Sequence, residues 1–106
     1  MSKDTLKLVL TDHWFEEIKS GRKTHEYRKA TPFWYRRLLE PMRIVALCNC
    51  DYELQRPQVQ FQKAYRKNPE HMTFEIERIT IIDGEDTDLK CVEDVFDIRL
   101  GRRIDE

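Results

Sequence analysis

Alternating apolar residues fill most of the second half of the chain, and this pattern constrains the fold more than any other feature. Residues 59–65, 72–82 and 95–104 place apolar side chains at every second position or nearly so, as β-strands with one buried face do. Only a turn and an acidic segment separate these three stretches. A doubly wound α/β fold needs a helix between successive strands, so the pattern indicates a mostly antiparallel sheet.

The first half of the chain mixes strands with two helices. Residues 6–11 alternate and predict a strand, and residues 23–28 predict a second one. A helix is expected between them, with Thr11 or Asp12 as its cap and Gly21 just past its end.

A second helix is expected to start at Thr31-Pro32, because threonine caps helices and proline fits their first turn. Pro41 is expected to stop it. The apolar run 43–49 then predicts a short buried strand. The expected order is therefore β-α-β-α-β-β-β-β.

The length of 106 residues suits one domain, spanning residues 1–106. We predict an α+β fold, a small and mostly antiparallel β-barrel with two flanking helices. The stretch 83–94 holds six acidic residues and one glycine. It is expected to be an exposed loop with a helical turn.

The cysteines and the apolar content predict a cytoplasmic protein without cofactor or metal. No apolar stretch approaches the length of a membrane span, and the N-terminal residues lack the pattern of a secretory signal. The odd count of three cysteines argues against a disulfide framework. Cys48 and Cys50 are two residues apart, so on a strand they would share one face as buried or half-buried thiols, and their spacing is unusual for a metal site.

Charge is distributed unevenly along the chain. Residues 1–67 contain 14 Lys or Arg against 8 Asp or Glu, whereas residues 68–106 contain 5 against 12. The basic half could supply a surface that faces phosphate groups. The alternative is that the charges mix on the folded surface.

The densest group of functional side chains lies between Gly21 and Lys29. On a regular strand, Thr24, Glu26 and Arg28 would share a face, and the carboxylate would orient the guanidinium. Lys23 has the opposite parity, so it can join them only if residues 21–23 are still turning. The alternative is an exposed edge strand whose charges pair weakly with one another.

The residues Gly21, Lys23, Glu26 and Arg28 complete the pattern G-x-K-x-x-E-x-R, and by it the chain resembles the ASCH domains, relatives of the PUA-like RNA-binding barrels. The runs EYRKATPFWYRRLL, FQKAYRKNPEHMTFEIERI and FDIRLGRRI are similar to small phage and bacterial members. The resemblance implies a small β-barrel with a cleft lined by the pattern residues. It also implies nucleic-acid or nucleotide ligands.

Some ASCH domains are enzymes, among them ribonucleases and hydrolases of N4-acylated cytosines. In those hydrolases a threonine nucleophile stands where this chain has Glu26, beside a lysine that matches Lys23. Thr24 does not align with that nucleophile, so the chain departs from the hydrolase pattern. If the protein is an enzyme, the resemblance points to Lys23 and Glu26 as its catalytic residues.

The sequence is therefore consistent with three functions. The first is binding of RNA or a nucleotide through the pattern residues, with Tyr35 and Tyr65 as stacking side chains and Trp14, Phe33 and Trp34 in the core. The second is hydrolysis of a modified nucleoside or of RNA. The third is interaction with a protein partner through the 83–94 loop and the Cys48–Cys50 strand. The ligand-binding candidates are Gly21, Lys23, Glu26, Arg28, Tyr35 and Tyr65.

Overall fold

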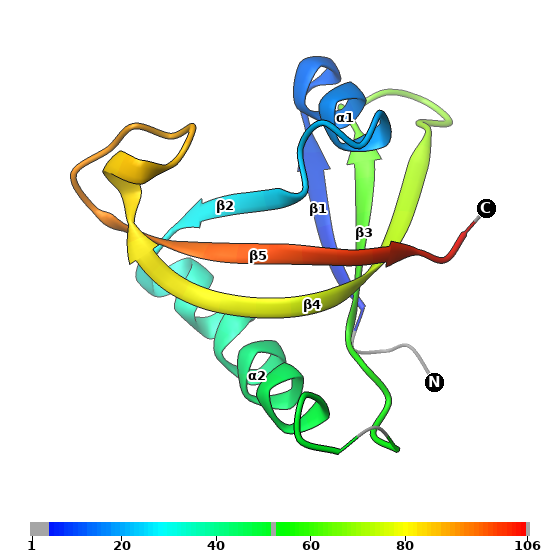
Figure 1. The fold of residues 1–106 in the computed structure, drawn as a ribbon. Helices are drawn as coiled ribbons and strands as arrows, with labels where there is room; N and C mark the ends of the chain where they lie inside the picture. Colours follow the sequence, from blue (N-terminus) through cyan, green and yellow to red (C-terminus); the bar gives the residue numbers. More distant parts are fainter. Residues whose placement is uncertain (1–4, 52, 106) are drawn as a thin grey trace.

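The computed structural model describes residues 5–51 and 53–105. They form five strands, two α-helices and one short 3₁₀ helix (Figure 1). In chain order these elements are β1 (Leu6–Leu10), α1 (Asp12–Lys19), β2 (His25–Lys29), α2 (Pro32–Cys48), β3 (Gln58–Lys63), β4 (His71–Asp83), η1 (Gly84–Asp86) and β5 (Asp94–Arg103).

The strands form one sheet in the order β1-β3-β4-β5-β2. β1 runs parallel to β3, and the other three pairings are antiparallel. Register shifts between Phe74 and Ile76 and between Ile76 and Arg78 lie on the long curved strand β4 (Figure 1), where bulges bend a sheet. The predicted α+β fold with two helices is confirmed, and the sheet is a curled half-barrel whose edge strands are β1 and β2.

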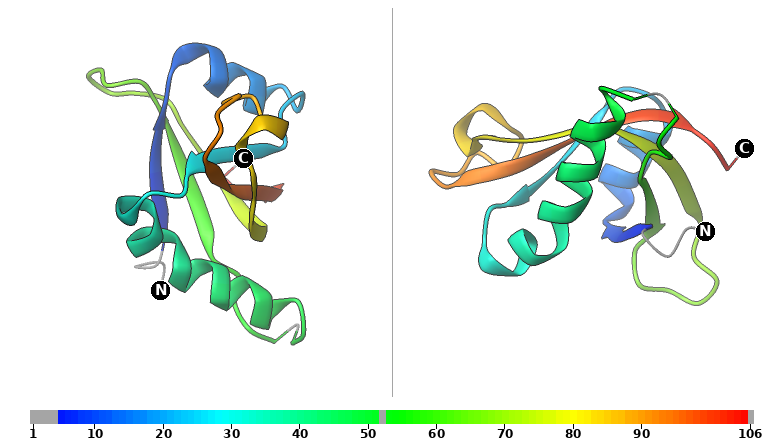
Figure 2. Two further views of the ribbon diagram at one scale, coloured as in Figure 1. Left: turned by 90° about the vertical axis from the view of Figure 1, so that its left-hand side faces the viewer. Right: turned by 90° about the horizontal axis from the view of Figure 1, so that it is seen from below.

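The core fills the inside of this curl. Its fully buried members include Phe15 from α1, Leu38 from α2 and the strand residues Phe61, Ile76 and Phe96. α1 lies at one end of β1 and β3, and α2 lies toward their other end (Figure 2). The two helices therefore cover different parts of the concave sheet and leave β2 between them.

The helix ends that were predicted from capping residues are confirmed. Thr11 and Thr31 are the N-caps of α1 and α2, and the Thr31 hydroxyl accepts a hydrogen bond from the Trp34 amide at 3.4 Å. Gly21 has a φ of +86° just past the end of α1. This left-handed conformation lets the chain turn at once into β2.

The predicted strand at 43–49 is wrong, because α2 continues through Pro41 to Cys48. Proline removes one backbone donor inside a helix. The carbonyl that loses it belongs to Arg37, an exposed residue at which water can replace the donor. Core-facing residues also recur along α2 at helical spacing: Trp34, Leu38, Met42, Val45 and Cys48.

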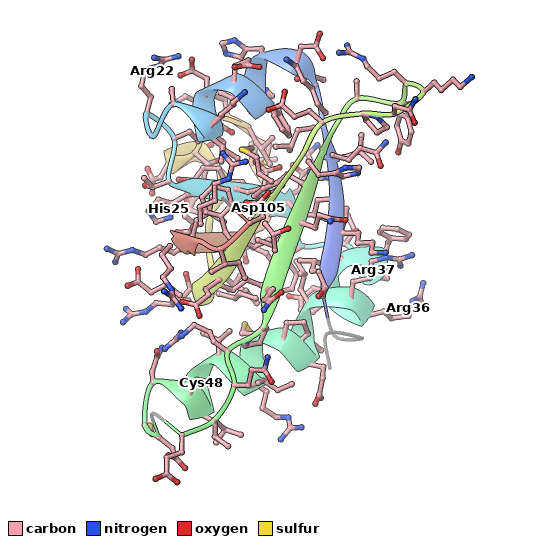
Figure 3. All side chains as sticks on the ribbon, turned by 90° about the vertical axis from the view of Figure 1, so that its right-hand side faces the viewer. Arg22, His25, Arg36, Arg37, Cys48 and Asp105 are labelled. Carbon is pink, nitrogen blue, oxygen red and sulfur yellow. The ribbon has the colours of Figure 1, made fainter. Side chains whose placement is uncertain are left out.

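The cysteines consequently do not share a strand face. Cys48 is buried at the last position of α2 (Figure 3), where its thiol donates to the Gln55 carbonyl at 3.6 Å. Cys50 follows in a turn and is exposed. The expected partner-binding strand built on these two residues is therefore absent from the described fold.

The acidic stretch 83–94 contains the helical turn predicted for it, η1. Gly84 is buried and packs so closely against the Glu93 carbonyl and the Cys91 thiol that a Cβ atom would collide with both. The Thr87 hydroxyl, also buried, donates to the Gly84 carbonyl at 2.8 Å and accepts from the Leu89 amide. The loop is thus a fixed structure with acidic side chains on its outside.

None of the helices in residues 5–51 and 53–105 has the length and apolar character of a membrane span. Within the same residues, no three His, Cys, Asp or Glu side chains gather closely enough to hold a metal ion.

Candidate functional site

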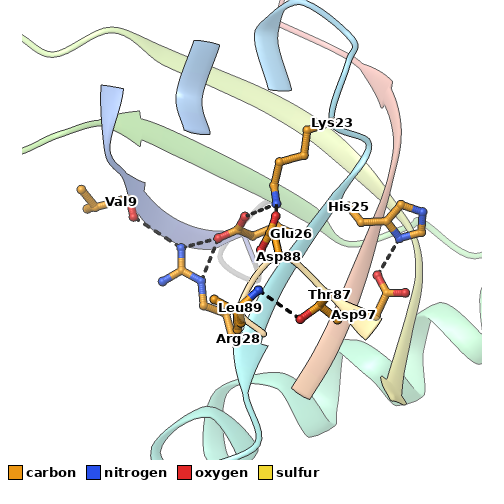
Figure 4. Close-up of polar contacts among 9 residues, drawn as sticks. All are labelled: Val9, Lys23, His25, Glu26, Arg28, Thr87, Asp88, Leu89 and Asp97. Carbon is orange, nitrogen blue, oxygen red and sulfur yellow. Dashed lines mark hydrogen bonds and ion pairs between the residues drawn. The ribbon is translucent and has the colours of Figure 1, made fainter. Parts of the chain in front are cut away.

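The four charged side chains of Lys23, Glu26, Arg28 and Asp88 meet beside β2, and we refer to them as the Glu26 cluster (Figure 4). Gly21 releases the chain from α1, so residues 21–24 are still turning when Lys23 is reached. Lys23 therefore reaches Glu26 despite its parity, with 3.8 Å between Nζ and Oε1. The pairing of Glu26 with Arg28 predicted from their shared face is confirmed, and Lys23, whose position the sequence left open, joins them.

Glu26 is the centre of the cluster and is 7% exposed. Its Oε2 accepts a hydrogen bond from Nε of Arg28 at 3.0 Å and forms an ion pair with Nη2 of the same side chain at 2.8 Å. Burial raises the pKa of the Glu26 carboxyl, although the charges of Arg28 and Lys23 act in the opposite direction. Desolvation therefore outweighs pairing at this carboxylate, which brings its protonation closer to neutral pH.

Arg28 also bridges the opening of the half-barrel. Its Nη2 donates to the backbone carbonyl of Val9 on β1 at 3.4 Å, although β1 and β2 are the two edges of the sheet. The side chain is only 20% exposed. The guanidinium therefore lies where the two sheet edges approach each other, fixed by contacts to both.

Asp88 completes the cluster from the acidic loop. Its carboxylate forms an ion pair with the ammonium of Lys23, whose side chain is 11% exposed. The sequence did not single out Asp88, because one acid among six in a loop carries no periodic signal. The fixed conformation of the loop positions this carboxylate over a lysine that lies 65 residues earlier.

Aromatic rings flank both cations. The Lys23 ammonium lies 4.6 Å from the centre of the Trp14 ring and 4.9 Å from that of Tyr27. The guanidinium of Arg28 lies 5.1 Å from the centre of the Trp34 ring. Such contacts are favourable for cations removed from water. Trp14 is 36% exposed, so the prediction that this tryptophan belongs to the core is wrong, and it belongs to the site.

Tyr27 lines two hollows beside the cluster. The Trp34 hollow has a volume of about 330 Å³ and is lined by Glu26, Tyr27, Arg28, Lys29, Thr31, Trp34 and Leu89. The Trp14 hollow, of about 490 Å³, is lined by Trp14, Glu17, Arg22, Lys23, Thr24, His25, Tyr27, Asp86, Thr87, Asp88 and Lys90. Both volumes lie in the range of small-molecule sites.

The two hollows differ in charge. The lining of the Trp34 hollow holds two cations, Arg28 and Lys29, against the single carboxylate of Glu26. The Trp14 hollow has three cations and three carboxylates at its wall, besides His25. An anionic group is therefore favoured in the Trp34 hollow, whereas in the Trp14 hollow it would compete with Asp88 for Lys23.

The structure separates the remaining predicted residues from the cluster. Tyr35 lies on α2, packs edge to face on Phe96 at 5.1 Å and lines neither hollow. Tyr65 is 87% exposed beyond the end of β3 and also lines neither. Gly21 contributes the turn and no side chain. The aromatic residues beside the cluster are instead Trp14, Tyr27 and Trp34.

His25 has a partner that the sequence did not reveal. Its Nδ1 lies 2.6 Å from Oδ1 of Asp97 on the adjacent strand β5, and its ring stacks on Tyr27 with 6.1 Å between ring centres. Asp97 comes 72 residues later, so only the pairing of β2 with β5 brings the two together. His25 forms part of the wall of the Trp14 hollow, which Lys23 also lines.

Comparison with known proteins gives no family assignment: no protein-family model matches the chain, and no curated protein matches it.

Proposed function

We propose that this protein binds RNA or a nucleotide through the Glu26 cluster and the Trp34 hollow. The observation that carries the proposal is the Glu26 carboxylate, buried between Lys23 and Arg28 at the wall of the Trp34 hollow. Burying such charges gives little or no net stability compared with apolar packing. A ligand that uses them is a better reason for their presence.

The groups around the Trp34 hollow match the parts of a nucleotide. Arg28 and Lys29 offer cationic donors to a phosphate. The Glu26 carboxylate can accept a hydrogen bond from the amino group of a base. Trp34 and Tyr27 offer aromatic rings to a base, and such stacking contributes about 1–3 kcal/mol.

We further propose that the chain is an ASCH domain of the PUA-like class and acts in the cytoplasm. Two features support this: the G-x-K-x-x-E-x-R residues Lys23, Glu26 and Arg28 gather into one cluster, and they do so on a curled half-barrel with two helices.

Hydrolysis of a modified nucleoside is the second candidate. It is favoured by the raised pKa of the Glu26 carboxyl beside the Lys23 ammonium, because an acid that ionises nearer neutral pH transfers protons more effectively. Incubation with N4-acetylcytidine, followed by chromatography, tests it. Turnover that is lost in Glu26→Gln would establish the hydrolase, and a stable substrate would exclude this reaction.

The binding proposal is tested by titrating labelled single-stranded RNA, single-stranded DNA and duplex at two salt concentrations. We expect salt-sensitive RNA binding that weakens at least tenfold in Lys23→Gln and Arg28→Gln. Each phosphate contact should contribute about 0.7 to the logarithmic salt slope for a single strand. Because both side chains are largely buried, thermal unfolding must show that each variant is folded at the assay temperature.

The matched controls are Lys19→Gln and Arg102→Gln, which remove exposed charges whose ion pairs, with Glu70 and Glu75, lie outside both hollows. They should bind like the wild type. Unchanged RNA affinity in folded Lys23→Gln and Arg28→Gln would refute the site. Absence of binding to every nucleic acid and mononucleotide would refute the function.

A further inference from the structure

An exposed aromatic residue on the first turn of α2 lies between the Trp34 hollow and a third hollow. This residue is Phe33, and it is 47% exposed. The third hollow, of about 490 Å³, lies between α2 and the start of β1, and Lys7, Arg37 and Glu40 are among its lining residues. We call it the Arg37 hollow. Nothing in the Glu26 cluster requires either feature.

Side-chain contacts connect the two hollows across Phe33. On one side, the Phe33 ring meets Trp34 edge to face, with 4.9 Å between ring centres and an interplanar angle of 88°. On the other side, the guanidinium of Arg37 lies 3.8 Å from the centre of the Phe33 ring. An aromatic and cationic path thus runs from the wall of the Trp34 hollow to the wall of the Arg37 hollow.

The charge along this path is mostly positive. Arg36 and Arg37 project from the same end of α2 (Figure 3), and Lys7 joins Arg37 in the hollow. Glu40 is the acid at this hollow, and its carboxylate is already paired with Arg43 at 2.7 Å. Proteins bind single-stranded nucleic acids through exposed aromatic rings that alternate with cations, because the bases stack on the rings and the phosphates contact the cations.

We propose that Lys7, Phe33, Arg36 and Arg37 form a track for single-stranded RNA that leaves the Trp34 hollow and continues toward the Arg37 hollow. Phe33 stacks on a base, and the three cations contact successive phosphates. This inference rests on the proposed function, because the Trp34 hollow is where the strand is anchored. It adds that the ligand is a strand rather than a mononucleotide.

The test compares a trinucleotide and a decamer of oligoadenylate, each labelled at one end. The trinucleotide can occupy the Trp34 hollow, and the decamer can also cover the track. The decamer should bind the wild type more tightly and with a steeper salt dependence. Phe33→Ala should weaken decamer binding roughly tenfold. Arg36→Ala combined with Arg37→Ala should lower the decamer salt slope by about 0.7 for each lost contact.

Trinucleotide affinity should stay the same in both track variants. The control is Arg66→Ala combined with Arg102→Ala, which removes two exposed arginines that pair with Asp12 and Glu75; it should keep decamer affinity. Equal affinity of the two oligomers for the wild type, or decamer binding unaffected by the track variants, would overturn the track alone. If neither oligomer binds, the track is overturned, and the titrations with the other nucleic acids and with mononucleotides show whether the proposed function fails with it.

Discussion

Glu26 and Asp12 are both carboxylates held by an arginine, yet their environments make them opposites. Arg28 Nη2 lies 2.8 Å from Glu26, and Arg66 Nη2 lies 2.7 Å from Asp12. The Glu26 side chain is 9% exposed, whereas that of Asp12 is 56% exposed. Burial raises the pKa of Glu26, and the hydrogen bond from Arg66 lowers the pKa of Asp12.

The distance between the charged atoms therefore does not by itself determine how an ion pair affects the pKa of its carboxylate. At the surface, water already solvates both partners, so pairing changes little. In the Glu26 cluster, the cost of desolvation dominates, and each buried charge needs the others to offset that cost.

The largest effect is expected for Glu26→Ala. This substitution leaves the poorly exposed Arg28 and Lys23 without their shared carboxylate, so the free energy of unfolding should fall by about 3 kcal/mol. Urea denaturation measures it. Asp12→Ala is the matched control and should lower the free energy of unfolding much less, because both partners of that pair are exposed. Equal effects of the two substitutions would show that the cluster is no more desolvated than the surface.

The pH dependence of stability should have opposite signs at the two sites. Because the folded-state pKa of Glu26 is raised from 4.5, its contribution is fully present below pH 4.5 and is lost as pH rises through the raised value. The contribution of Asp12 is present above pH 3.8 and is lost as pH falls through its lowered pKa.

Urea unfolding at a series of pH values, with Glu26→Gln and Asp12→Asn, measures this. The stability advantage of the wild type over Glu26→Gln should shrink as pH rises above 4.5, and that over Asp12→Asn should shrink as pH falls below 3.8. A constant difference between wild type and Glu26→Gln would mean that Glu26 is effectively solvated.

The smallest effect is expected for Asp88→Asn. Asp88 holds the Lys23 ammonium in the described structure, so a phosphate that approaches Lys23 must compete with it. Removing that competitor should raise RNA affinity by roughly fivefold, the upper range for a partly exposed pair. Asp86→Asn is the control, because it removes one negative charge from the wall of the same hollow and leaves the ion pair between Asp88 and Lys23 intact. If both substitutions raise affinity equally, general electrostatics and not the Lys23 pair is responsible.

Local signals in the sequence predicted much of the fold. Alternation predicted β1, β4 and β5 closely, and Thr11, Gly21 and Thr31 marked helix ends because capping chemistry is local. The run 43–49 was misassigned, because a short apolar run suits a buried strand or a buried helix equally. The core spacing along α2 shows that packing against the sheet, rather than Pro41, decided the outcome.

For the site, the sequence indicated that Glu26 and Arg28 share one face of a strand, whereas it left open whether Lys23 joins them. The tertiary fold alone pairs Asp88 with Lys23 and Asp97 with His25. It also places the rings of Trp14 and Trp34 beside the two cations. Those partners come from distant elements. The curl of the sheet brings them together, and no local interaction encodes it. Burial, which sets the pKa of Glu26, is likewise a property of the assembled fold.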